Sequence, residues 1–80
     1  MRVRILAFAQ LRELFGAQHF DLALAEGSTV GDAIEQLASR AQFEPFAGST
    51  RCARNGSIAQ ESEPLSDGDE LALLPPVGGG

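Results

Sequence analysis

Alternating apolar and polar positions predict two strands and a short helix in the first quarter of the chain. Residues 3–9 are a candidate strand, because Arg2 and Arg4 alternate with Val3 and Ile5 in the repeat of a strand. Leu6 and Phe8 fall on the same face as the arginines, so this strand is either covered on both sides or offers Phe8 to a partner. A second alternating run occupies residues 19–24. Between the two strands, residues 10–15 have the pattern of one or two helical turns.

The strongest helical pattern begins at Thr29. From Val30 to Ala41, apolar residues recur three or four positions apart and form one continuous stripe. Thr29 is a candidate N-cap, and Asp32 lies three residues further on, as in a capping box. These features predict an amphipathic helix that lies on a sheet.

Turn residues divide the second half of the chain into short strands. Asn55-Gly56 separates two short runs and predicts a hairpin, because both residues tolerate a positive φ. In the polar connection that follows, Leu65 is the apolar residue expected to enter the core. Residues 70–74 form the last predicted strand, in which Leu71 and Leu73 should face the helix.

This order of elements predicts an α+β domain with one principal helix packed on one face of a sheet. No helix is predicted for the second face. Phe8 and Leu74 would both lie there, and they could form an exposed apolar patch or be half-buried by loops.

Composition excludes several functions. The 80 residues carry a formal net charge of −5, which disfavours binding to a nucleic acid backbone. All six cationic residues are arginines, so the chain cannot form conjugates through lysines of its own. Cys52 is the single cysteine, and on a predicted strand it is best explained as a small buried hydrophobe. No stretch has the length of a membrane span or the pattern of a signal sequence, so we expect a cytoplasmic protein.

Two further groups of polar residues have ordinary explanations. His19 lies on the polar face of its predicted strand and is expected to be solvated. The acidic residues Asp67, Asp69 and Glu70 could suggest a cation site, but their spacing does not match an EF-hand loop. Turn formation and a solvated face explain them better.

The last ten residues are the most distinctive stretch of the chain. Pro75-Pro76 ends the final strand and favours an extended continuation. Beyond it, Val77 to Gly80 reaches at most ~14 Å when fully extended. Because glycine has no Cβ, such a thread can enter a narrow channel in a partner. We therefore expect a folded body of residues 1–76 and a flexible glycine tail of residues 77–80, which ends in the α-carboxylate of Gly80.

Residues 64–80, with the sequence PLSDGDELALLPPVGGG, resemble the C-terminal end of the molybdopterin synthase small subunits, the MoaD family of ubiquitin-like sulfur carriers. Further matches are FAQLRELFG at residues 8–16, Thr29-Val30 at the start of the main helix, and Asn55 in the hairpin. The resemblance covers nearly the whole chain and implies a ubiquitin-like β-grasp fold. Arg54 departs from the family pattern, which usually has an apolar residue there, so the sheet register or its outer face could differ.

The resemblance implies the sulfur carrier subunit of molybdopterin synthase, with no independent active site. An activating enzyme that uses ATP with Mg would convert Gly80 to an acyl adenylate, and a sulfur donor system would convert the adenylate to a thiocarboxylate. Inside the large subunit of a heterotetramer, the thiocarboxylate would give its sulfur to a cyclic pyranopterin phosphate and form the molybdopterin dithiolene. The resemblance implies no tightly bound cofactor, no metal, no nucleic acid and no membrane.

The predicted site has three parts. Gly80 carries the reacting group, and Gly78 and Gly79 give it access. The residues predicted to dock against a partner are Phe8, Leu74, Pro75, Pro76 and Val77.

Other functions stay open besides the molybdopterin synthase subunit. The activated tail could serve another pathway, as a sulfur carrier for thiamin, cysteine or tRNA thiolation, or as a ubiquitin-like modifier that joins lysines of other proteins. A third possibility is a ubiquitin-like interaction module with an inert tail.

Overall fold

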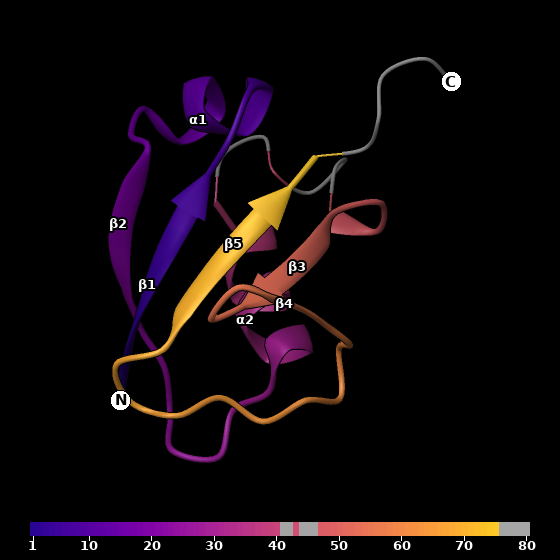
Figure 1. Ribbon diagram of the computed structural model, residues 1–80. Coiled ribbons are helices and arrows are strands. Elements are labelled where there is room, and N and C mark those ends of the chain that lie inside the picture. Colours follow the sequence, from indigo (N-terminus) through magenta and orange to yellow (C-terminus); the bar gives the residue numbers. More distant parts are fainter. Residues whose placement is uncertain (41–42, 44–46, 76–80) are drawn as a thin grey trace.

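The computed structural model describes residues 1–40, 43 and 47–75, and in this part of the chain five strands form one mixed sheet (Figure 1). The order of the strands across the sheet is β2-β1-β5-β3-β4. The elements are β1 (Arg2–Ala7), α1 (Gln10–Phe15), β2 (His19–Ala23), α2 (Val30–Ala38), β3 (Arg51–Arg54), β4 (Ser57–Ala59) and β5 (Glu70–Leu74).

The two central strands, β1 and β5, run parallel, and all other neighbouring strands run antiparallel. Figure 1 shows α2 behind the sheet, where it covers one face, while neither described helix covers the opposite face. The α+β class and the single principal helix are therefore confirmed. Burial alternates along β1 as predicted, with Val3 and Ile5 fully buried beneath α2. The buried core consists of Val3, Ile5, Ala7, Leu11, Leu22, Leu24, Val30, Ala33, Ile34, Leu37, Phe43, Cys52, Leu65, Leu71 and Leu73.

The N-terminus of α2 has the predicted capping box. The Thr29 hydroxyl accepts a hydrogen bond from the Asp32 amide at 3.2 Å, and the Asp32 carboxylate accepts one from the Thr29 amide at 2.9 Å. The amide of Gly31 donates to the Glu61 carbonyl at 2.9 Å. A Cβ at position 31 would lie 3.2 Å from that carbonyl oxygen, so the close approach of the 61–63 connection favours glycine there.

Asp69 is buried, and the solvated position expected for it is wrong. Its carboxylate accepts hydrogen bonds from Arg54 Nε at 2.7 Å, Asn55 Nδ2 at 3.0 Å and the Ser66 amide at 2.7 Å. Arg54 also forms an ion pair with Glu63 at 3.2 Å. These partners account for an arginine where an apolar residue was expected, and the register of β3 continues without a break through Arg54.

The hydrogen bonds determine the ionisation of Asp69. Burial by itself would raise the pKa of this carboxyl group, but the hydrogen bonds from Asn55, Ser66 and Arg54 outweigh burial and lower the pKa. The folded state therefore favours the charged carboxylate.

Replacing Asp69 by asparagine should lower the free energy of unfolding by about 1–3 kcal/mol near neutral pH, because buried donors lose their charged acceptor. Since folding lowers the pKa of Asp69, its contribution is fully present above the unfolded-state value of about 4 and is lost as the pH falls through the folded value. Urea titrations at pH 7 and pH 3 should show the difference between wild type and Asp69→Asn narrowing at pH 3. Asp21→Asn, at an exposed carboxylate, is the control. A pH-independent difference would contradict this assignment.

Candidate functional site

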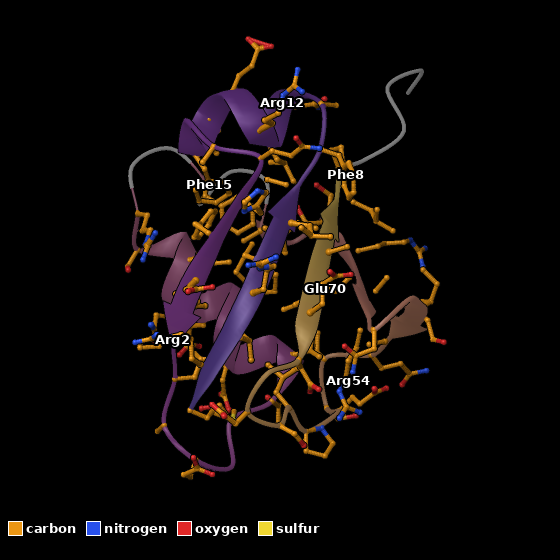
Figure 2. All side chains as sticks on the ribbon, turned by 60° about the vertical axis from the view of Figure 1, so that its left-hand side comes forward. Arg2, Phe8, Arg12, Phe15, Arg54 and Glu70 are labelled. Carbon is orange, nitrogen blue, oxygen red and sulfur yellow. The ribbon has the colours of Figure 1, made fainter. Side chains whose placement is uncertain are left out.

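The site begins where β5 ends. In the parallel β1–β5 register Ala7 pairs with Leu73, so the next residues, Phe8 and Leu74, lie side by side on the face opposite α2. Phe8 is 39% exposed and Leu74 is half-buried. Figure 2 shows Phe8 at this end of the sheet, beside the end of β5. Of the two arrangements left open by the sequence, the structure therefore has an exposed Phe8 next to a partly covered Leu74.

An apolar row continues from this pair across the uncovered face. The register joins Leu6 to Ala72, Ala72 to Ala53, and Ala53 to Ile58, so four strands contribute one row. Ile58, on the edge strand β4, is 64% exposed. We call the set the outer strip. It consists of Leu6, Phe8, Ala53, Ile58, Ala72 and Leu74.

The sequence did not identify Ile58 as part of this surface. β4 has only three residues, and this is too short for an alternating pattern to separate an inward from an outward side chain. The signal that could have found it is the Asn55-Gly56 turn. A two-residue hairpin fixes the pairing of Ala53 with Ile58, and paired residues share a face.

Towards the opposite end of the strands, the uncovered face becomes charged. Arg4 stands in register between Asp21 of β2 and Glu70 of β5. Arg2 lies one rung further along, and Figure 2 shows it and Glu70 away from Phe8. The outer strip therefore lies close to the end of β5, and a charged surface lies farther from that end. Two exposed polar residues border the strip, Arg51 in register with Leu74 and His19 in register with Leu6.

The predicted tail lies outside the described residues. Pro76, Val77, Gly78, Gly79 and Gly80 are therefore not placed, and the boundary between body and tail stays a prediction. Pro75 is the last described residue and is half-buried after Leu74.

Cys52 is buried in the core, as predicted for a small hydrophobe. Burial raises the pKa of its thiol to about 11, and the nearby charge of Glu61 adds to this effect. Because the thiolate is the nucleophilic form, this cysteine is a poor candidate for carrying sulfur. His19 is exposed, in agreement with a solvated side chain.

The described residues contain neither a candidate metal site nor a membrane-spanning helix. Within residues 1–40, 43 and 47–75, no three His, Cys, Asp or Glu side chains are grouped so that they could hold a metal ion. No helix in the same ranges is long and apolar enough to cross a membrane.

With its thiol pKa at about 11, Cys52 should resist iodoacetamide at pH 8, where about one thiol in a thousand is ionised. Mass spectrometry should show slow labelling of the native protein and fast labelling in urea, which exposes the thiol. Rapid labelling of the native protein at pH 8 would contradict the structure.

The model of the ThiS family matches residues 5–80. The molybdopterin synthase sulfur carrier subunit of Escherichia coli is 36% identical over an alignment of 81 positions. The alignment covers 98% of this chain and 99% of the relative. Small archaeal modifier protein 1 of Haloferax volcanii is 37% identical over an alignment of 82 positions. The alignment covers 91% of this chain and 94% of the relative.

Several solved structures are similar to this chain. A Pyrococcus furiosus protein assigned as molybdopterin converting factor subunit 1 has a TM-score of 0.87 and 30% identity, over 96% of this chain and 99% of that chain. A chain from the complex of subunits 1 and 2 of the Helicobacter pylori molybdopterin-converting factor has a TM-score of 0.73 and 25% identity. The match covers 100% of this chain and 100% of that chain. A Caldiarchaeum subterraneum ubiquitin has a TM-score of 0.68 and 21% identity, over 100% of this chain and 98% of that chain. At this identity the similarity shows the fold alone. The predicted β-grasp fold is confirmed.

Proposed function

This chain belongs to the ThiS family and is a sulfur carrier of the ThiS and MoaD type, and on that premise we propose that it is the sulfur-carrying small subunit of molybdopterin synthase. One observation carries the proposal. The parallel β1–β5 register places the exposed ring of Phe8 beside Leu74, immediately before the prolines and glycines of the C-terminal sequence. In the proposal, this pair is part of the docking surface, and the segment that ends in the reactive Gly80 follows it in the sequence.

The proposed chemistry takes place at Gly80. A carboxylate is a poor electrophile, so the activating enzyme first joins it to the adenylyl group of Mg-bound ATP and releases pyrophosphate. A donor sulfur at the oxidation level of sulfide then attacks the acyl carbon and expels AMP, which leaves a thiocarboxylate. Its sulfur is anionic and nucleophilic near neutral pH, by analogy with a thiolate. Hydrolysis of the acyl–sulfur bond after transfer would return the carboxylate.

The body of the chain supplies position. In the proposal, the outer strip docks on the large subunit of a heterotetramer, and the tail enters the active site of that subunit. Pro75, Pro76 and Val77 hold the tail extended, and Gly78 and Gly79 let it pass through a narrow channel. The thiocarboxylate sulfur would then attack a carbon of the bound cyclic pyranopterin phosphate in an effectively intramolecular step and displace the oxygen on that carbon. Each thiocarboxylate would supply one of the two sulfurs of the dithiolene.

Charge divides the work between the two subunits. With a net charge of −5, this chain is a poor ligand for the pterin phosphate, so the large subunit should supply the basic groups. The proposal places the chain in the cytoplasm, where its single cysteine would stay reduced.

A second candidate function is protein modification. The 37% identity with small archaeal modifier protein 1 favours it, because the same activated glycine could acylate lysines of other proteins. The two functions share the activation step and differ in the acceptor, a pterin in one case and a lysine amine in the other.

Incubation with ATP, Mg²⁺, an activating enzyme and a sulfur donor should convert Gly80 to the thiocarboxylate. Intact-mass analysis should show the replacement of one oxygen by sulfur at the C-terminal residue. Deleting Gly79 and Gly80 should abolish this mass gain and all sulfur transfer, while the free energy of unfolding stays within about 0.5 kcal/mol of wild type. Full activity of the deletion variant would identify an interaction module with an inert tail. Isopeptides on other proteins, without pterin sulfuration, would identify a modifier.

Phe8→Ala should weaken binding to the purified large subunit by about 2 kcal/mol, roughly thirtyfold, because an aromatic anchor at the centre of an interface is removed. Ile58→Ala should weaken it less, since this residue lies at the far edge of the outer strip. Glu35→Ala, on the exposed side of α2, is the control and should bind as wild type does. Calorimetric titration measures all three, and wild-type affinity in Phe8→Ala would remove the outer strip from the interface.

A further inference from the structure

The chain turns from β1 into α1 through a strained residue, Ala9. Its φ is 51° and its ψ is −128°. The Phe8 carbonyl accepts a hydrogen bond from the Leu11 amide at 3.0 Å, so residues 8–11 form a β-turn with Ala9 in the second position. These angles are close to those of a type II′ turn, in which glycine normally occupies that position. A residue with a Cβ is held there at a cost in free energy.

The other positive φ among the described non-glycine residues has an ordinary explanation. Asn55, at φ 49°, is in the hairpin turn, where asparagine is a favoured residue. Ala9 has no such advantage. It occupies the N-cap of α1, and its methyl group cannot accept a hydrogen bond from the helix.

Packing on both sides holds the strained turn in place. Ala7 precedes it and Leu11 follows it, and both are fully buried. Between these anchors, Phe8 is 39% exposed and belongs to the outer strip. Strained backbone of this kind persists where its surroundings over-determine it, and it is concentrated at functional sites.

We propose that Ala9 is a positioning residue for partner recognition, because its strained turn holds Phe8 outward beside Leu74 before the partner binds. This inference rests on the proposed function, in which the large subunit is the partner. A ring that moved freely would lose that freedom on docking and weaken the complex. Alanine permits far fewer backbone conformations than glycine, so with Ala7 and Leu11 buried on either side, an alanine at position 9 leaves Phe8 fewer arrangements than a glycine would.

The test is Ala9→Gly. The melting temperature should stay the same or rise, because relief of the strain offsets the greater freedom of glycine in the unfolded chain. Affinity for the purified large subunit should fall roughly three- to tenfold. Ala25→Gly, the same change at an exposed loop position, is the control and should leave affinity unchanged.

A second variant separates strain from rigidity. Chemical synthesis gives access to a chain with D-alanine at position 9, which favours a positive φ and remains more restricted than glycine. This chain should melt at a higher temperature and bind as tightly as wild type.

In a double-mutant cycle, Ala9→Gly should cause little further loss of affinity for the large subunit once Phe8 is alanine, since both changes act through the same ring.

Each remaining outcome counts against a definite claim. Equal affinity of wild type and Ala9→Gly, or a lower melting temperature in Ala9→Gly, would overturn the role of Ala9 and leave the proposed function intact. Failure of the wild-type chain to bind the large subunit at all would overturn both.

Discussion

The parallel pairing of β1 with β5 is the constraint on which the rest of the structure depends. It joins the first strand of the chain to the last, through pairs that run from Arg4–Glu70 to Ala7–Leu73. A contact between segments so distant in sequence carries a large cost in chain entropy. Burial offsets that cost, because Ile5 and Leu71 pair within the core and neither is exposed to solvent. The same pairing brings Phe8 to the place where β5 ends.

A buried charge holds the beginning of β5. Asp69 binds Arg54 and Asn55 of the β3–β4 hairpin through its side chain, and its carbonyl accepts a hydrogen bond from the Arg4 amide at 2.8 Å. These bonds come from both neighbouring strands, so they fix the register of β5. The register matters for function because a slip of one residue would turn Leu74 towards the core. The register also determines how much chain continues beyond the sheet.

The similarity of this chain to both a sulfur carrier subunit and a protein modifier follows from the way the site is built. The β-grasp body supplies an uncovered sheet face, and in the proposed function the reactive group is on a terminal segment that needs no pocket of its own. A fold of this kind can deliver the same activated glycine to different acceptors. In the proposed function, specificity would depend on side chains of the outer strip and on the turn at Ala9, which are local features of the surface.

The sequence by itself determined the features that depend on near neighbours. The strands, the capping box at Thr29 and the Asn55-Gly56 hairpin follow from residue types a few positions apart, and the structure contains all of them. It also predicted a buried Cys52 and an inward Leu65. Only the tertiary structure decided the burial of Asp69, because its side-chain partners Arg54 and Asn55 lie 15 and 14 residues away. Likewise, the full burial of Phe43 and the positive φ of Ala9 depend on segments that pack together across the fold, and periodicity within one segment carries no record of that packing.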